Sequence, residues 1–366
     1  MAEAASAVVR RWTTAAPILA IVLLALTWGR DLHPAVVLVV ALALGVVVLS
    51  AVHHAEVVAH RVGEPFGSLI LAVAVTVIEV ALIVTLMLAG GPEKASLARD
   101  TVFAALMISC NGIVGLSLLA STTRGRIAVF NAEGSGAALA TITALATLSL
   151  VLPTFTTSTP GPTFSGAQLA FAALASLALY GLYVFIQTVR HRSHFLAPDG
   201  ATASDLEDEP AERPTSRAAA ASLGLLAVAL VGVVGLAKVA SPSIEALVRD
   251  AGLPLSVVGV VIALLVLLPE SLAAVRAARR RHLQTSFNLA YGSAMASIGL
   301  TIPVIAVASL AMAAPLQLGL GATELVLLAL TVVVSILTVT PGRATLLQGG
   351  VHLAVFAGFL VLAFSP

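Results

Sequence analysis

About eleven stretches of the chain are apolar over the roughly 20 residues that an α-helix needs to cross a bilayer. Hydrophobic residues make up 59% of the 366 residues and charged residues only 10%, which excludes an ordinary water-soluble domain, where about 25% are charged. We therefore predict an all-α polytopic membrane protein with about 11 transmembrane helices. The predicted helices lie near residues 14–30, 34–52, 67–90, 101–120, 134–153, 166–189, 218–240, 254–275, 286–312, 322–340 and 346–364.

Charge and motif content exclude several classes of protein. The formal net charge is +1, and no block of Lys and Arg alternates with aromatic residues, so we predict no nucleic-acid partner. The single cysteine, Cys110, excludes an intrachain disulfide and a CxxC pair. The HExxH and GxSxG motifs are absent from the sequence. The sequence therefore predicts neither an enzyme nor a bound cofactor.

The distribution of basic residues predicts the orientation. If the N-terminus is cytoplasmic, 14 of the 19 Lys and Arg residues fall on cytoplasmic segments. Cytoplasmic segments of membrane proteins carry such an excess of positive charge. We therefore predict a cytoplasmic N-terminus and a C-terminus on the outer side. The basic residues predicted on the outer side are Arg30, Lys94, Arg99, Lys238 and Arg249.

The long polar segment at 190–217 has the composition of a disordered linker. Its acidic residues lack the spacing and central glycine of an EF-hand loop, which favours a solvated tether over a calcium sensor. Around it we predict an N-terminal helix at 1–33, a five-helix repeat at 34–189 and a second five-helix repeat at 218–366. The acidic residues of the linker are Asp199, Asp205, Glu207, Asp208, Glu209 and Glu212.

The two predicted repeats share a pattern. The segment Arg61–Pro65 precedes a span that contains Glu79, and Arg249–Pro254 precedes a span that contains Glu270. Because Arg61 is predicted on the cytoplasmic side and Arg249 on the outer side, the two repeats have opposite orientations. Inverted repeats of this kind are typical of secondary transporters.

The two glutamates are the strongest candidates for a functional site. A charged acid at mid-membrane costs on the order of 3 kcal/mol, so it is retained where it is partnered, protonated or facing a wet cavity. Each glutamate could simply hydrogen-bond to a neighbouring helix while protonated, but their matched positions favour one binding site formed by both. Pro269, directly before Glu270, removes a backbone donor and frees a carbonyl that could help bind a cation.

Two such carboxylates predict exchange chemistry. Burial and mutual repulsion disfavour the doubly charged pair, so it accepts either protons or a cation. If the empty pair cannot cross the occluded state, cation and protons must exchange. Carboxylate and carbonyl oxygens suit transported Ca²⁺, Na⁺ or K⁺, with Glu79 and Glu270 as the metal ligands. The alternative is a passive cation channel that uses the same acidic residues.

Several segments resemble known transporters. Phe287–Ser293 resembles the second α-repeat of the calcium:cation antiporter superfamily, in its cation/proton exchanger branch. Further segments resemble the bacterial ChaA-type sodium(potassium, calcium)/proton antiporters; they are His60–Leu71, Leu268–Leu272, Gly342–Thr345 and Gly349–Leu353. The resemblance implies one extra helix plus two inverted five-helix repeats. It also implies a multi-pass protein of the cell inner membrane that exchanges cytoplasmic cations for external protons.

The resemblance also implies roles for individual residues. Glu79 and Glu270 match the paired family glutamates that bind cation or proton, and Ser293 with nearby carbonyls matches the ligands of a partner helix. The chain lacks the family asparagine before each acid and has Ala296 where the family has glutamine. Fewer side-chain oxygens weaken a Ca²⁺ cage of six to eight ligands, which makes Na⁺ or K⁺ transport more credible.

Other polar residues are possible neighbours of the site. Thr76, one turn before Glu79, either binds the cation or hydrogen-bonds to its own i−4 carbonyl. Asn111 and Ser297 either bind the cation or mediate helix packing. Glu324 lies near the outer end of its span, where a solvated role or a role at the mouth of the pathway is favoured over mid-membrane binding. The sequence predicts inorganic cations, protons and the lipid bilayer as partners, and does not predict the oligomeric state.

Overall fold

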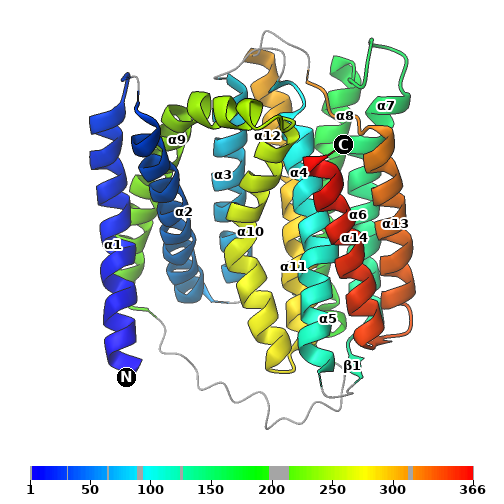
Figure 1. Cartoon of the computed structure of the whole chain (residues 1–366). Coiled ribbons are helices and arrows are strands. Elements are labelled where there is room, and N and C mark those ends of the chain that lie inside the picture. The colour runs from blue at the N-terminus through cyan, green and yellow to red at the C-terminus, as the bar shows by residue number, and fades with distance from the viewer. Residues whose placement is uncertain are drawn as a thin grey trace. The chain divides into compact units, whose positions relative to one another are not determined.

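Helices account for almost all of the described chain in the computed structural model, which describes residues 2–30, 32–63, 66–88, 94–123, 127–197, 214–311 and 316–365. Their order is shown in Figure 1. The elements are α1 (Ala2–Thr27), α2 (Pro34–Val62), α3 (Phe66–Leu88), α4 (Leu97–Met107), the π-helical segment η2 (Ile108–Ile113), α5 (Val114–Thr122), β1 (Ala128–Val129), α6 (Ala132–Ala146), η3 (Thr147–Val151), α7 (Leu152–Phe155), α8 (Gly166–Phe185), η4 (Ile186–Arg190), η5 (Arg192–Phe195), α9 (Ser216–Asp250), α10 (Ser256–Arg279), α11 (Leu283–Gly299), α12 (Thr301–Ala308), η7 (Ser309–Ala311), α13 (Ala322–Val339), β2 (Arg343–Ala344) and α14 (Leu346–Phe364).

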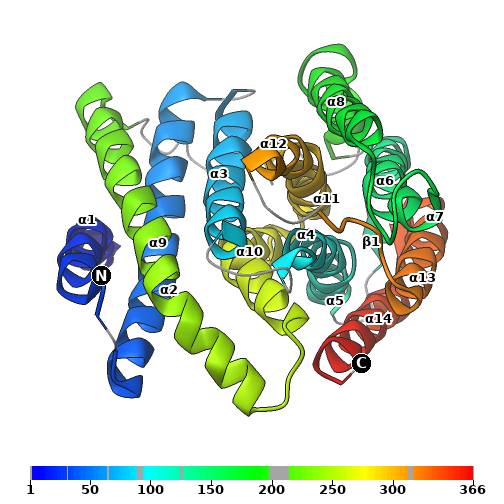
Figure 2. The ribbon, with the colours of Figure 1, turned by 90° about the horizontal axis from the view of Figure 1, so that it is seen from above.

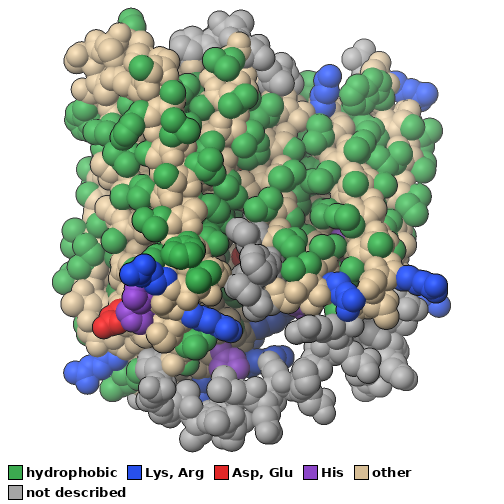
Figure 3. Space-filling view, turned by 180° about the vertical axis from the view of Figure 1, so that it is seen from behind, with side chains coloured by type: hydrophobic (Ala, Val, Ile, Leu, Met, Phe, Trp, Pro, Cys, Tyr) green, Lys and Arg blue, Asp and Glu red, His purple; other side chains and the backbone are tan. Residues whose placement is uncertain are grey.

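The helices have the length and composition of membrane spans. Within the described residues, 9 helical segments are long and apolar enough to cross a bilayer, and two shorter apolar segments lie in α1 and α3. Exposed apolar side chains are spread over the helix surfaces seen in Figure 3. These findings confirm the predicted all-α polytopic membrane protein with about 11 transmembrane helices.

The helices pack as two compact units. Helices α1, α2, α3 and α9 form unit 1, and α4 to α8 together with α10 to α14 form unit 2. Helix α9 follows the predicted linker, yet it packs along α2, which precedes it. The proposed division at 190–217 into an N-terminal helix and two repeats stays a prediction, and the six acidic residues of the linker lie outside the described residues.

Unit 1 is built on the contact between α2 and α9, with α1 and α3 also packed against α9 (Figure 2). Gly235 of α9 lies directly against Leu24 of α1, so a larger residue at Gly235 would force the two helices apart. Buried His54 of α2 ties the unit together, because its Nε2 lies 3.0 Å from the Thr13 carbonyl and its Nδ1 lies 3.3 Å from the Ser222 hydroxyl.

Unit 2 is built around the broken span α4–η2–α5. In the most apolar continuous stretch of 18 residues in this span, 89% of the residues are buried. The corresponding share in the other candidate spans of the described chain is at most 61%. Helices α10, α11 and α14 pack against it. Strands β1 and β2 form a short antiparallel pair, in which Ala128 pairs with Ala344.

Two of the spans that pack against α10 differ locally from the sequence prediction. The predicted span 101–120 is one helical path, but its centre widens into the π-helix η2. The predicted span 286–312 divides at Leu300 into α11 and α12. Gly299 ends α11 against α8, where an added Cβ would lie 2.6 Å from the Cβ of Tyr180.

Candidate functional site

Glu270 lies on the buried face of α10. The buried residues Gly259, Ala263, Glu270, Ala274 and Ala278 recur at helical spacing, so they share one side of the helix. The side chain of Glu270 is 9% exposed. The small residues on either side of Glu270 allow neighbouring helices to approach closely, which is the usual packing in membranes.

This face of α10 runs alongside α4–η2–α5. Near its start, a Cβ on Gly259 would lie 3.0 Å from the backbone nitrogen of Thr101. Near its end, the Ser121 hydroxyl donates to the Ala278 carbonyl at 3.2 Å. Helix α10 and the span α4–η2–α5 therefore run in the same direction, and equal numbers of residues cover nearly equal distances along both. Glu270 lies about midway between these two contacts, so it is level with η2, which packs against α10.

The hairpin between α10 and α11 brings Ser293 to the same depth. Glu270 lies nine residues before the last residue of α10, and Ser293 lies ten residues after the first residue of α11. At about 1.5 Å of rise per residue, both lie about 15 Å from the turn. Ser293 is half-buried, and Ser297, one turn deeper, is 3% exposed.

Asn111 lies in η2 and is fully buried. Its amide nitrogen Nδ2 donates to the Thr331 hydroxyl at 2.9 Å, and its Oδ1 lies 3.2 Å from His352 Nδ1. A carbonyl oxygen has two lone pairs, so Oδ1 keeps one for a further partner. Unit 2 therefore brings Glu270, Ser293 and Asn111 to one level, while the binding role of each stays a prediction.

Pro269 does not break α10, which continues to Arg279. Because proline has no N–H, the Leu265 carbonyl one turn earlier lacks its helical donor. This carbonyl and the Glu270 carboxylate are oxygens of the kind that hard cations prefer. The helix thus continues past Pro269 without dividing, and a role for the freed carbonyl in cation binding stays a prediction.

Glu79 belongs to unit 1. It lies in α3 with an exposed fraction of 2%, and Thr76, one turn before it, is 5% exposed. Apolar Ile78 and Leu82 are buried on the same helix. Burial of an acid in so apolar a helix matches the expectation from the sequence. A site shared by Glu79 and Glu270 and a ligand role for Thr76 stay predictions.

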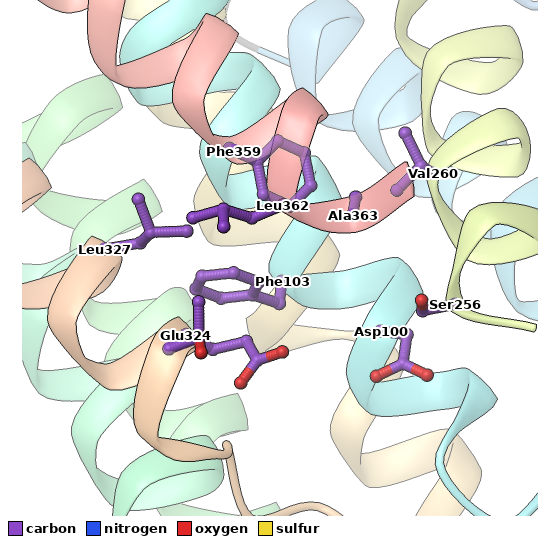
Figure 4. A pocket seen from close by; sticks show the side chains of 10 residues that line it. Asp100, Phe103, Ser256, Val260, Glu324, Leu327, Phe359, Leu362 and Ala363 are labelled. Carbon is purple, nitrogen blue, oxygen red and sulfur yellow. The ribbon is translucent and has the colours of Figure 1, made fainter. Parts of the chain in front are cut away.

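A second group of acids lines a pocket in unit 2, shown in Figure 4. The pocket has a volume of about 80 Å³. Asp100 and Glu324 lie at one end of it, while Phe103 and Phe359 line the remainder. Asp100 forms a salt bridge, because the Arg99 guanidinium lies 2.7 Å from its Oδ1.

Among the described residues, no group of three or more His, Cys, Asp or Glu side chains could hold a metal ion. The oxygens that lie level with Glu270 in unit 2 come instead from a serine hydroxyl, an amide and backbone carbonyls. Such a mixed set fits a transported hard cation better than a resident transition metal.

Sequence reasoning missed the partners of Asn111. His352 is fully buried in α14, and its Nε2 lies 3.1 Å from the Thr338 hydroxyl of α13. The segment Gly349–Leu353 stood out only for its resemblance to antiporters. A histidine within a predicted transmembrane span was the signal available, since such residues are costly in lipid and face the protein interior.

Comparisons with known proteins extend over nearly the whole chain. A family model described as Sodium/calcium exchanger protein matches residues 32–189 and 221–365. The sodium-potassium/proton antiporter ChaA of Escherichia coli is 36% identical over 352 residues, which cover 95% of each chain. A protein of Sinorhizobium fredii that carries the name ionic transporter y4hA is 44% identical over 364 residues, covering 99% of this chain and 98% of that one.

Two solved structures have the same fold. Native YfkE superposes with a TM-score of 0.68 at 16% identity, covering 96% of this chain and 98% of that chain. The H⁺/Ca²⁺ exchanger CAX gives a TM-score of 0.67 at 16% identity, covering 96% and 91%. The family match and the two sequence relatives are decisive: this multi-pass membrane protein belongs to the sodium/calcium exchanger family of transporters.

Proposed function

We propose that the protein is a secondary active antiporter that exchanges Na⁺, K⁺ and/or Ca²⁺ for H⁺ across the inner membrane, using Glu79 and Glu270. The observation that carries the proposal is the placement of buried Glu270 level with Asn111 and Ser293 in unit 2. The E. coli relative, which is named a sodium-potassium/proton antiporter, supports the same activity.

Charge balance supplies the mechanism. A buried glutamate that loses its proton needs a cation nearby, because an isolated charge in low dielectric is costly. Cation entry therefore displaces protons from Glu79 and Glu270, and protons arriving from the other side displace the cation. The transporter changes access only when both carboxylates are neutralised, which couples the two flows.

The ligand set favours monovalent cations. Ca²⁺ takes six to eight oxygen ligands, and this chain lacks the family asparagine before each acid and has Ala296 where the family has glutamine. We propose Na⁺ and K⁺ as the preferred substrates, with Ca²⁺ bound more weakly. The excess of basic residues on one set of segments supports a cytoplasmic N-terminus and a C-terminus on the outer side.

Reconstituted vesicles with an acidic interior and an enclosed pH dye test the proposal. Addition of Na⁺, K⁺ or Ca²⁺ outside should make the interior alkaline, and the half-maximal concentrations rank the cations. Glu79→Gln and Glu270→Gln should each remove the response. Glu133→Gln is the matched control, because that side chain is 73% exposed and should leave exchange unchanged.

Two results contradict the proposal. Wild-type protein that is folded in the vesicles yet gives no pH response to any cation is not a proton antiporter. Cation uptake without proton movement, measured with the membrane potential short-circuited, identifies a passive channel instead.

A further inference from the structure

A buried polar cluster lies inside unit 2, and we call it the His352 cluster: Asn111, Thr331, Thr338 and His352. All four side chains are at most 2% exposed. They come from three elements, since Asn111 lies in η2, Thr331 and Thr338 in α13 and His352 in α14. The cluster thus ties the π-helical centre of the α4–η2–α5 span to two neighbouring helices.

Glycines bring α14 close enough for this cluster to form. A Cβ on Gly115 of α5 would lie 2.8 Å from Leu353 Cγ, and a Cβ on Gly349 of α14 would lie 3.1 Å from Leu118 Cβ. The two backbones therefore approach as closely as the absence of side chains permits. Gly349 lies one turn before His352, so the close contact and the hydrogen bonds occur side by side.

The hydrogen bonds of the cluster have a consistent direction. Asn111 Nδ2 donates to Thr331, which leaves Asn111 Oδ1 to accept from His352 Nδ1. The neutral imidazole then carries its proton on Nδ1, and His352 Nε2 accepts from the Thr338 hydroxyl. Both ring nitrogens are satisfied without a carboxylate. Complete burial without a counter-charge favours this neutral form, so His352 acts as a fixed donor and acceptor rather than as a proton carrier.

The carboxylates of the Figure 4 pocket lie away from the cluster. Glu324 is seven residues before Thr331 on α13, and Asp100 is eleven residues before Asn111. These separations correspond to about 10 Å and about 16 Å along the helix axes. The rings of Phe103 and Phe359, whose centroids are 5.8 Å apart, line the part of the pocket between these carboxylates and the His352 cluster.

The element that the cluster holds is the one beside Glu270. Segment η2 packs against α10 and α11 as well as against α13 and α14. A π-helical turn interrupts the regular ladder and is often found at functional sites. A segment with irregular hydrogen bonding needs outside contacts to keep one conformation, and the His352 cluster provides them.

We propose that His352 is a positioning residue for cation binding: its hydrogen bond to Asn111 fixes η2, and thereby the groups of unit 2 that face the cation beside Glu270. This inference rests on the proposed function. Partners that orient ligating side chains typically alter affinity or activity by roughly 10- to 100-fold when they are removed. His352→Leu should therefore raise the half-saturating cation concentration within that range, with little change in the maximal rate.

Rescue and control variants separate this role from a general packing defect. His352→Gln supplies an amide donor and a carbonyl acceptor in place of the two ring nitrogens, so it should keep most of the affinity that His352→Leu loses. Thr338→Val removes only the bond to Nε2 and should give a smaller loss in the same direction. Ser335→Ala is the matched control, because its fully buried hydroxyl lies one turn from Thr331 and makes no hydrogen bond among the described residues.

Two kinetic results overturn the inference. Unchanged half-saturation in folded His352→Leu shows that the residue does not position the site. A fall in maximal rate with unchanged half-saturation, or no rescue by His352→Gln, assigns it another role. Thermal unfolding of each variant confirms that the protein compared is folded.

A spectroscopic measurement tests the cluster without transport. Protein labelled with ¹⁵N at the imidazole nitrogens should show, at neutral pH, a neutral signal protonated at Nδ1 that disappears in His352→Gln. An imidazolium signal, or a proton on Nε2, contradicts the assigned hydrogen bonds. A wild-type protein that exchanges no cation overturns the proposed function and the transport role of His352, whereas this spectrum still reports on the cluster.

Discussion

The two broken spans that flank α10 in unit 2 interrupt their helices in different ways. In α4–η2–α5 the chain stays helical but widens into a π-turn, and Asn111 there is bound by His352 and Thr331. In α11–α12 the helix divides at Leu300, and Ser293 is half-buried. The first span therefore holds its polar residue by hydrogen bonds to α13 and α14, whereas the second has a small, half-buried hydroxyl. We infer that the first serves as a fixed wall of the site and the second as its more adaptable side.

The largest expected effect belongs to the residue between these spans. Glu270→Gln keeps the size of the side chain but removes the charge that must be neutralised, so exchange should fall to background. Proton movement in vesicles measures it. Proton-coupled cation flux that is retained in Glu270→Gln would show that exchange does not depend on the Glu270 carboxylate.

Substitutions of the two polar residues should separate the spans. Asn111→Leu should weaken cation affinity and also lower stability by about 1–3 kcal/mol, because buried His352 loses its partner. Ser293→Ala should weaken affinity while leaving the unfolding midpoint unchanged. Half-saturation together with thermal unfolding in detergent checks both. If Asn111→Leu and Ser293→Ala lower the unfolding midpoint equally, the first span is not held more rigidly than the second.

Glycines of the two spans should respond in opposite ways. Gly115→Ala places a Cβ 2.8 Å from Leu353 and 3.1 Å from the Gly349 carbonyl, so it should destabilise by about 1–3 kcal/mol through overpacking. Gly292→Ala meets no heavy atom within 4 Å and should be neutral or stabilising by up to about 1 kcal/mol. Denaturant unfolding compares them. A stable Gly115→Ala variant would mean that α5 and α14 are not closely packed.

The smallest expected effect concerns the hydrogen bond that joins the two spans directly. The Ser286 hydroxyl of α11 donates to the Ser117 hydroxyl of α5 at 2.7 Å, and both residues are fully buried. Interhelical bonds of this kind average about 0.6 kcal/mol in membranes. A double-mutant cycle of Ser286→Ala and Ser117→Ala should give a coupling energy near that value. A coupling of zero would show that the spans are joined by packing alone.

The sequence was sufficient to predict the spans and the buried acids, because both depend on composition over about 20 residues. Apolar runs located the helices that are long enough to cross a bilayer among the described residues, and an acid in the middle of α3 or α10 was visible without a structure. The π-turn at η2 was not predictable, since Ile108–Ile113 reads as ordinary apolar helix. Its surroundings are tertiary: Gly349 and His352 of α14 contact the α4–η2–α5 span from another part of the chain.

The Asn111 prediction illustrates the same limit of local reasoning. Its residue type suggested a ligand or a packing contact, and the structure gives it hydrogen-bond partners 220 and 241 residues away. No local pattern encodes such a pairing. Similarly, the packing of α9 with α2 joins segments on opposite sides of the predicted linker, and hydrophobic patterning does not specify it.

The most direct test is simultaneous measurement of cation uptake and proton release in vesicles that contain wild-type protein or Glu270→Gln. The proposed mechanism predicts that in the wild type every uptake of cation is accompanied by proton release in a fixed ratio, and that both flows cease in Glu270→Gln. Cation uptake that proceeds without proton release in the wild type, or coupled exchange that persists in Glu270→Gln, would contradict it.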